Sequence, residues 1–398
     1  MKAKFVAVLL ILSCSVLPAR AINPDSTNIS LLTVLPWGQE VYTIYGHTSI
    51  RVCSPSEGID VVFNYGTFDS TKPHFIYNFV RGKTDYKLGL ESFPEYVLKY
   101  TVENGTAFEQ VLNIPSDEKL KLLQWLEWNY RPENCEYRYN YFFDNCTTRP
   151  RDLIDKYCGG KLIYQLPEEV TTFRQLVHQN TAPYPWMEFG IDLLIGSGAD
   201  SLISYRSEMF LPVKLMEALD KASVFDTLPA DSIRPIVSGT HVILRARPEA
   251  PAQVFFFSSP LKTGVMLLIL CLAAAVCGFI FKRSFRFFFG LIYLSAALTG
   301  SLVFFIAFFS LHPCTFPNFN LLWLHPLHWI AFAGYCFKKT YPLFKWYHRT
   351  NFVLLSVFLA AWPLIPQELN LANIPFMLCL WVASGWYLLN ARQKRNRK

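Results

Sequence analysis

The segment YNYFFDNCTTRPRD, residues 139–152, contains the strand-to-helix transition on which the predicted fold of the N-terminal half depends. Its aromatic residues alternate as in a strand, and Pro150 is tolerated only in the first turn of a helix, so a helix should begin close to Cys146. The unpaired amides and dipole of a helix start lower the pKa of a cysteine, and Arg149 and Arg151 add positive charge. Cys146 is therefore a candidate nucleophile. The alternative is a buried, unreactive thiol.

The composition divides the chain into two parts. The protein has 398 residues, of which 52% are hydrophobic and 16% aromatic, and its mean hydropathy is +0.22. The apolar surplus lies after about residue 260, which indicates a soluble domain followed by a membrane domain. The net charge of +7 does not indicate nucleic-acid binding, because much of the Lys and Arg lies in short clusters beside apolar segments and no nucleic-acid motif is present.

The first residues have the pattern of a secretory signal peptide. Lys2 and Lys4 precede a short apolar run, and a small-x-small cleavage pattern ends at Ala21. Cys14 offers an alternative reading as a lipoprotein signal, but in either case the segment that follows is exported. The predicted organisation is a signal peptide at 1–21, an exported domain at 22–250, a linker at 251–262 and a membrane domain at 263–398.

Five apolar segments make up the predicted membrane domain. The third and fourth are short, and flanking aromatic residues extend them towards the ~20 residues that a span needs. The segments are Thr263–Phe281, Phe287–Phe309, Leu321–Phe337, Phe352–Leu364 and Ile374–Leu389. Lys and Arg cluster at 282–286, 338–349 and 392–398 and are absent from 310–320 and 366–373. With an exported N-terminal domain, this bias predicts five spans with all three basic clusters, the C-terminus included, in the cytoplasm.

The exported part contains four cysteines: Cys53, Cys135, Cys146 and Cys158. An oxidising compartment allows one or two disulfides among them. If Cys146 is a working thiol, at most one pair remains, and Cys53 with Cys135 is one possibility. None of the spacings is that of a structural zinc site.

His325 and His328 lie three residues apart at the start of the third apolar segment. Ionisable residues in membrane segments are costly and suggest a function. Two histidines without a carboxylate make a poor metal site, so we expect headgroup contact or hydrogen bonding between helices. No metal or cofactor is predicted for this protein.

A candidate general base lies far upstream of the cysteine. From His47 onward the chain alternates, with His47 and Ser49 on one face of a predicted strand and Thr48 on the other. Residues 61–65 return as a second strand, which puts Asn64 within reach of His47. A thiol nucleophile needs a base and a third polar group that fixes the base, and amides at a helix start can stabilise an oxyanion. The alternative is that His47 and Asn64 are ordinary strand residues.

Two further segments shape the predicted α+β fold. Residues 116–129 form an amphipathic helix for which Ser116 is the expected N-cap, with leucines recurring on one face. Residues 161–245 read as helices and loops, including Arg174 and the run 190–196, and end in a strand at 241–247. They either line a substrate groove or pack and cap helices.

Three motifs together resemble the Lnb lipoprotein N-acyltransferases: YGHTSIRV at 45–52, FNYGTFD at 63–69 and NCTTRPRD at 145–152. Those proteins also carry a C-terminal membrane domain, so the resemblance covers nearly the whole chain. It implies a permuted papain-like core, an antiparallel sheet plus helices, similar to lecithin:retinol acyltransferase. It also implies that Cys146 is the nucleophile and His47 its base. Asn64 takes the third position, where the retinol enzyme has a histidine.

The resemblance implies a membrane-anchored thiol acyltransferase in the bacterial inner membrane, with its catalytic domain in the periplasm and its C-terminus in the cytoplasm. Cys146 would accept an acyl chain from a phospholipid donor and pass it, without a cofactor, to the N-terminal amine of a diacylglyceryl lipoprotein. Two alternatives remain at this point. One is a membrane-anchored cysteine amidase or peptidase that acts on peptidoglycan, and the other is a non-enzymatic membrane sensor or scaffold.

Overall fold

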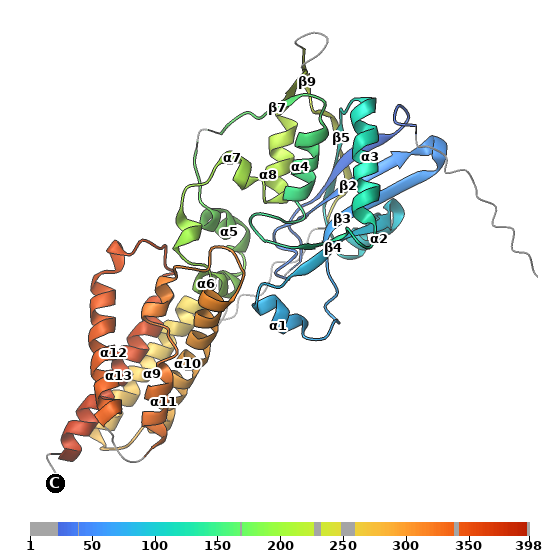
Figure 1. The fold of residues 1–398 in the computed structure, drawn as a ribbon. Coiled ribbons are helices and arrows are strands. Elements are labelled where there is room, and N and C mark those ends of the chain that lie inside the picture. Colours follow the sequence, from blue (N-terminus) through green and yellow to red (C-terminus); the bar gives the residue numbers. More distant parts are fainter. Residues whose placement is uncertain are drawn as a thin grey trace, which may run out of the picture.

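The computed structural model describes residues 23–38, 40–167, 169–226, 232–247, 259–337 and 342–395, the last four of them by backbone only. The N-terminal part is an α+β domain with an antiparallel sheet, and the C-terminal part is α-helical (Figure 1). The predicted signal peptide and most of the predicted linker lie outside the described residues.

A seven-stranded antiparallel sheet forms the centre of the N-terminal domain, in the order β10-β5-β1-β2-β3-β4-β6. The strands are β1 Asn28–Val34, β2 His47–Ser54, β3 Ile59–Thr67, β4 Asp85–Ser92, β5 Ala107–Leu112, β6 Glu136–Arg138 and β10 Val237–Leu244. The predicted hairpin of His47 and Asn64 is confirmed as β2 and β3, which pair with Ile50 opposite Phe63. The aromatic run is strand only in β6, and residues 139–144 form a loop that an Asn140–Asp144 bridge closes.

Helices cover both faces of this sheet. On one face Ile50 and Val52 pack with Leu126 of α3 (Ser116–Tyr130) and Ile154 of α4 (Thr148–Tyr157). On the other face Leu32 and Val62 pack against α2 (Phe93–Val102). Successive side chains of a strand point to opposite faces, so the apolar residues along these strands contribute to the cores on both faces of the sheet.

The expected Ser116 cap is wrong. Pro115 occupies the N-cap position, and Ser116, the first helical residue, hydrogen-bonds Asp25 instead. The remaining elements of the domain are α1 Phe75–Val80, α5 Phe173–Thr181, α6 Pro185–Leu194, α7 Tyr205–Glu208, α8 Pro212–Asp220 and the three-stranded sheet β7 Lys161–Ile163, β8 Ser223–Phe225 and β9 Ile233–Pro235.

Among the described residues, three helices are long and apolar enough to cross a membrane: α9 Pro260–Ile280, α10 Arg286–Phe309 and the part of α13 at Asn373–Ala391. The predicted third span is interrupted, because only a 3-10 turn at Phe319–Leu322 and the short α11 (His328–Cys336) form on either side of Pro326. The predicted fourth span lies mostly in α12 (Pro342–Ala360), whose first half mixes aromatic residues with Lys345 and Arg349.

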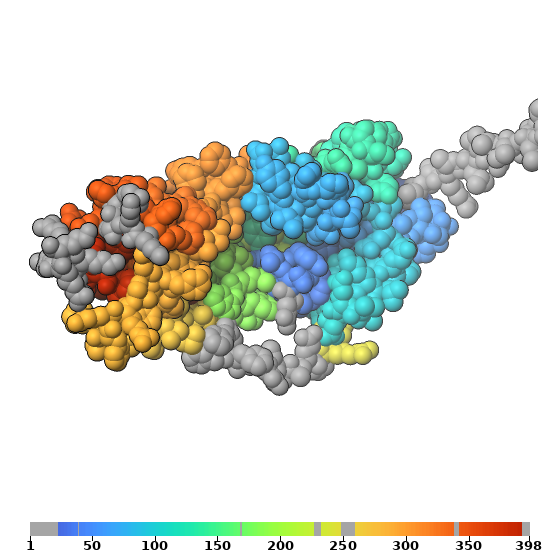
Figure 2. Space-filling view, turned by 90° about the horizontal axis from the view of Figure 1, so that it is seen from below, coloured from blue at the N-terminus to red at the C-terminus, as the bar shows by residue number. Residues whose placement is uncertain are grey.

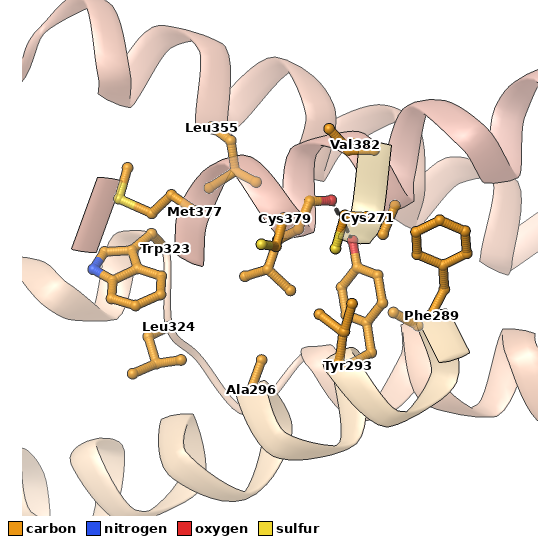
Figure 3. Packing of buried hydrophobic residues seen from close by; sticks show 14 of the residues in the cluster. Cys271, Phe289, Tyr293, Ala296, Trp323, Leu324, Leu355, Met377, Cys379 and Val382 are labelled. Carbon is orange, nitrogen blue, oxygen red and sulfur yellow. Dashed lines mark hydrogen bonds between the residues drawn. The ribbon is translucent and has the colours of Figure 1, made fainter. Parts of the chain in front are cut away.

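The C-terminal helices pack around one apolar core. Figure 3 shows Tyr293 and Phe289 of α10 beside Cys271 of α9 and Val382 of α13. The Tyr293 hydroxyl donates to the Leu380 carbonyl at 3.0 Å. This buried hydroxyl is therefore satisfied by a neighbouring helix of the bundle.

His328 belongs to this internal network. It is buried, accepts from the Tyr347 hydroxyl at Nδ1 (2.6 Å) and donates from Nε2 to the Trp323 carbonyl (2.9 Å). Of the two roles expected for this histidine, hydrogen bonding between helices is the one observed.

The two parts of the chain meet at α6. Phe189 and Leu193 of α6 belong to the apolar core of the C-terminal bundle. Arg174, fully buried, binds Asp192 at 2.8 Å and Asp200 at 2.5 Å, and Asn370 of the C-terminal part donates to Asp192 at 2.9 Å. Arg174 and the segment 190–196 thus act in packing, the second of the two expected readings.

Candidate active site

His47 is the first residue of β2, and its ring contacts the Asn64 side chain on β3. The distance between His47 Nε2 and Asn64 Oδ1 is 3.2 Å. Asn64 Oδ1 also accepts from the Ser49 hydroxyl at 2.6 Å, and Asn64 Nδ2 donates to Glu91 at 2.7 Å. Because a carboxylate only accepts, Glu91 fixes the amide with its oxygen towards His47. His47 therefore carries its proton on Nε2, and Nδ1 is the free basic nitrogen.

Burial keeps the His47 imidazole neutral. It is the main cause that lowers the pKa of His47 to about 4, and the positive charge of Lys99 adds to the effect. The hydrogen bond with Asn64 acts in the opposite direction but is weaker. A neutral imidazole at physiological pH is the form that can accept a proton.

Cys146 lies at the same end of the sheet. The Thr48 side chain meets Thr147 with the two hydroxyl oxygens 3.2 Å apart, and the Thr48 backbone N–H points at the Cys146 thiol. His47 is thus the first residue of β2, and the Cys146 thiol lies against the next residue of that strand, Thr48. Within the described residues no hydrogen bond joins Sγ to the imidazole, a state common in enzymes without substrate.

Gly66 on β3 leaves room for this approach. Its φ of +85° lies in the region that favours glycine. A Cβ at Gly66 would lie 3.0 Å from the Tyr139 ring and 3.5 Å from the Cys146 Cβ. The glycine of the FNYG motif therefore permits Tyr139 and Cys146 to pack on the end of β3.

The expectation that the helix start lowers the pKa of Cys146 is wrong. Burial raises the pKa of the Cys146 thiol and outweighs the nearby donors, which are the Thr147 and Tyr139 hydroxyls and the Thr48 and Cys146 amides. Cys146 precedes the N-cap residue Thr147, so it lies just outside the helix. The raised pKa of the Cys146 thiol and the lowered pKa of the His47 imidazole both favour the neutral forms at physiological pH.

The amides at the start of α4 are occupied. Asn145 Oδ1 accepts from the backbone N–H groups of Thr147 and Thr148, each at 2.8 Å. These amides were the expected oxyanion donors. They donate instead to the Asn145 side chain, which caps the start of the helix. The side-chain donors that face Sγ are the Tyr139 hydroxyl at 4.0 Å and the Thr147 hydroxyl at 3.8 Å, and the Thr48 and Cys146 amides are the nearby backbone donors.

The two arginines after the cysteine are also occupied. Arg149 forms two hydrogen bonds with Asp144, at 2.6 and 2.8 Å, and lies over the Tyr137 ring. Arg151 binds Asp152 and the Arg206 carbonyl. Their charges hold the loop and α4 in place rather than stabilise a thiolate.

All four cysteines of the N-terminal part are free thiols in the structure. The possible Cys53–Cys135 pair is not formed, because Cys53 lies beside Arg51 while Cys135 packs on the core of the opposite sheet face. Cys146 is therefore not blocked by a disulfide.

A group of possible metal ligands lies away from the thiol, at His178, Glu188 and Asp192. Its atoms are already bonded: Asp192 Oδ1 binds Arg174 and His178, and Glu188 accepts from Thr181. The Arg174 guanidinium already supplies a positive charge to Asp192. These residues fit an ion-pair network better than a metal site.

Sequence reasoning missed Glu91 and Ser49, which position Asn64, and Tyr139, whose hydroxyl faces the thiol. Ser49 shares the face of His47 by strand alternation and could have been found. Glu91 and Tyr139 depend on the pairing of β3 with β4 and on the path of the loop after β6, which no local pattern encodes.

Comparison with known families gives two matches. Residues 16–179 match a family model described as the Lnb N-terminal periplasmic domain, and residues 252–395 match one described as the Lnb transmembrane domain. Neither the curated proteins nor the solved structures that were compared give a match.

Proposed function

The chain belongs to the Lnb family of lipoprotein N-acyltransferases, and on that premise we propose that it transfers an acyl chain through Cys146 to the N-terminal amine of a lipoprotein. The family match makes it an inner-membrane protein with a periplasmic N-terminal domain that takes part in lipoprotein processing. The reaction, its donor and its catalytic residues form the proposal.

The observation that carries the proposal is the convergence of Cys146, His47 and Asn64 at one end of the sheet. Nδ1 of His47 is free to accept a proton, since Nε2 is engaged by Asn64. Cys146 Sγ lies against the residue next to His47. These are the nucleophile, base and orienting group of a thiol acyltransferase.

In the first half-reaction, the Cys146 S–H proton passes to His47 Nδ1 as sulfur attacks the ester carbonyl of a phospholipid. The Tyr139 and Thr147 hydroxyls and the Thr48 and Cys146 amides are the available donors for the resulting oxyanion. The C–O bond of the ester then breaks. His47 returns its proton to the leaving oxygen of the lysophospholipid, and the acyl group remains on sulfur as a thioester.

In the second half-reaction, the neutral amine of the lipoprotein attacks the thioester, and His47 takes a proton from the attacking nitrogen. The C–S bond breaks, the amide forms and the Cys146 thiolate recovers its proton from His47. No cofactor is needed, because the thioester retains the acyl-transfer potential of the ester.

We further propose that the C-terminal helices cross the inner membrane with their α6 end at the periplasmic face. Asn318 and Gln367, in the connections before α11 and α13, bind carbonyls of α6 at 2.9 and 3.1 Å. The α9–α10 connection, with Lys282 and Arg283, lies at the far end of the bundle, as does the end of α13 (Figure 1). Basic residues at that end favour a cytoplasmic C-terminus. In this arrangement α11 and α12 complete a five-segment membrane domain.

The decisive experiment expresses the full chain in cells that lack their own lipoprotein N-acylation and analyses lipoprotein N-termini by mass spectrometry. We expect N-acylated lipoprotein with wild type and with Cys53→Ala, a thiol away from the site, and none with Cys146→Ala. Absence of product from wild type, or product from Cys146→Ala, would refute the proposal. Hydrolysis of peptidoglycan peptides by wild type, without N-acylation, would favour the amidase instead.

A further inference from the structure

A cavity of about 350 Å³ opens on the N-terminal domain between the β3–α1 connection and β4. Phe68, Phe75 and Tyr86 form an apolar wall, and Lys72, Lys83 and Lys87 line its polar part. Its volume is in the range of ligand-binding pockets. It lies outside the residues assigned to catalysis above.

The lysines of the cavity are available to a ligand. All three are exposed, and in the described part of the chain the lysine that forms ion pairs with carboxylates is Lys121, on α3. The cavity also contains Asp69, Asp85 and Glu136.

Of these carboxylates, Asp85 is paired with Arg138 at 2.6 Å, and Asp69 accepts two hydrogen bonds from Thr71. Glu136 is the cross-strand neighbour of Lys87 and forms no ion pair among the described residues. The cavity therefore offers three lysines and two carboxylates, Asp69 and Glu136, that form no ion pair among the described residues, and this mixed charge matches a phosphate group that carries an ammonium a few bonds away.

A series of aromatic contacts connects the apolar wall of the cavity with the Cys146 thiol. The ring of Phe68 lies 5.0 Å from that of Tyr86, and Tyr86 lies 4.9 Å from Tyr139. The Tyr139 hydroxyl is 4.0 Å from Cys146 Sγ. One ring contact, that of Tyr86 with Tyr139, thus separates the cavity wall from the residue whose hydroxyl faces the proposed nucleophile.

Residues on the other side of the cavity contact the C-terminal helical bundle. His312, in the connection after α10, donates from Nε2 to the Phe79 carbonyl at 2.7 Å, and the Leu311 N–H donates to the Arg81 carbonyl at 2.9 Å. Figure 2 shows the blue surface around α1 against the orange surface of this part of the bundle. The cavity therefore lies at the end of an apolar, membrane-crossing helix.

The exposed face of α1 is apolar. Ile76 is 77% exposed, Tyr77 56% and Phe79 46%. Such residues on an exposed helix at the end of a membrane bundle are typical of an element that lies in the lipid interface.

We propose that this cavity binds the phosphate-bearing polar end of the donor phospholipid, with α1 resting in the outer leaflet. The inference rests on the proposed function, because it assigns the donor of that reaction to a place in the fold. The lysines hold the phosphate, Glu136 faces an ammonium headgroup, and the ester is presented along Phe68 and Tyr86 towards Cys146. The acyl chains remain beside the apolar face of α1.

The first test is photolabelling of the full-length protein in nanodiscs with phosphatidylethanolamine that carries a diazirine in its headgroup. We expect label in residues 67–87, and a loss of that label in Lys72→Gln/Lys83→Gln but not in Lys121→Gln. Equal labelling of both variants, or label confined to other segments, would overturn the proposal. Excess inorganic phosphate should not compete, because free phosphate lacks the apolar contacts. Competition by a diacylglyceryl lipopeptide, which has no phosphate, would assign the cavity to the acceptor and overturn it as well.

The second test separates this proposal from the proposed function. Acylation of Cys146 is followed by mass spectrometry with phosphatidylethanolamine and with p-nitrophenyl butyrate, which has no headgroup. We expect the double lysine variant to raise KM for the phospholipid about 10-fold, the loss of about one charge-assisted hydrogen bond. Reaction with the small ester should stay unchanged. If wild type acylates Cys146 from neither donor, the proposed function fails, and the labelling result still decides whether the cavity binds lipid.

Discussion

Oδ1 of Asn64 lies 3.2 Å from Nε2 of His47 and accepts a second hydrogen bond from Ser49. Glu91 holds the other end of the same amide at 2.7 Å. The orientation of the base therefore depends on three residues from strands β2, β3 and β4. Each of them can be tested separately.

Replacing Asn64 by alanine should leave the imidazole free to rotate. We expect the rate of Cys146 acylation to fall about 10-fold to 100-fold, as small displacements of catalytic groups do. The measurement is single-turnover formation of the acyl-enzyme. Asn113→Ala, an exposed asparagine next to β5, is the control and should keep the wild-type rate. An unchanged rate in Asn64→Ala would show that Asn64 does not position the base.

Replacing Tyr139 by phenylalanine removes one hydroxyl near the thiol and leaves the ring contact with Tyr86 in place. Burial raises the pKa of Tyr139 well above its usual value, so the hydroxyl remains a donor at every physiological pH. Loss of one oxyanion donor should lower the rate constant for acylation about 100-fold with little change in KM. A change confined to KM would assign Tyr139 to lipid binding instead.

The raised pKa of the Cys146 thiol predicts slow alkylation at neutral pH. The thiol of wild type should react with iodoacetamide more slowly at pH 7 than a free cysteine does, and the rate should keep rising above pH 9. Quantified mass spectrometry of the peptide that contains Cys146 gives the rate, and Cys146→Ser is the blank. Rapid alkylation at pH 7 would show a preformed thiolate and contradict the neutral pair.

The lowered pKa of His47 predicts a loss of stability in acid. Between pH 6.5 and about 4 the unfolded chain binds a proton that the folded imidazole does not, so stability decreases as the pH falls through this window. At pH 5 the loss is about 2 kcal/mol. Thermal unfolding in detergent at pH 7 and pH 5 should show a smaller decrease for His47→Gln than for wild type. An equal decrease in both would assign the acid sensitivity to other groups.

Arg174 and Asp192 form a buried ion pair at the junction of the two parts, so replacing Asp192 by alanine should strongly lower the stability of the protein. Asp192→Ala leaves the Arg174 guanidinium with one fewer carboxylate in a site where both side chains are at most 2% exposed. We expect a loss of about 3 kcal/mol. Asp117→Ala, which breaks an exposed pair with Lys121, should cost less than about 1 kcal/mol. Similar melting temperatures for the two variants would contradict a structural role of the buried pair.

Several parts of this protein could be predicted from local patterns. Alternation along residues 47–52 and 61–65 is a property of adjacent residues, so the contact of His47 with Asn64 could be predicted before any tertiary structure. Pro150 placed the start of α4 to within about two residues. The predicted cap at Ser116 was wrong by one residue, because both Pro115 and Ser116 can serve either as cap or as first helical residue.

The membrane domain shows what the apolar composition of a segment cannot predict. The length of the apolar segments predicted helices α9, α10 and α13 correctly. The third segment has the composition of a span, but its helix is interrupted at Pro326. Hydropathy averages over a window and does not register one residue that interrupts a helix.

The sequence by itself determined the two-part organisation, the sheet-and-helix class of the first part and the identity of His47, Asn64 and Cys146 as candidates, because periodicity and residue type are local properties. Only the tertiary structure decided the protonation of the site. Burial of Cys146 and His47 by distant segments outweighs the helix start and neighbouring arginines, and Asn145 occupies the helix amides. Desolvation depends on every segment that packs around a group, and no stretch such as residues 139–152 contains that information.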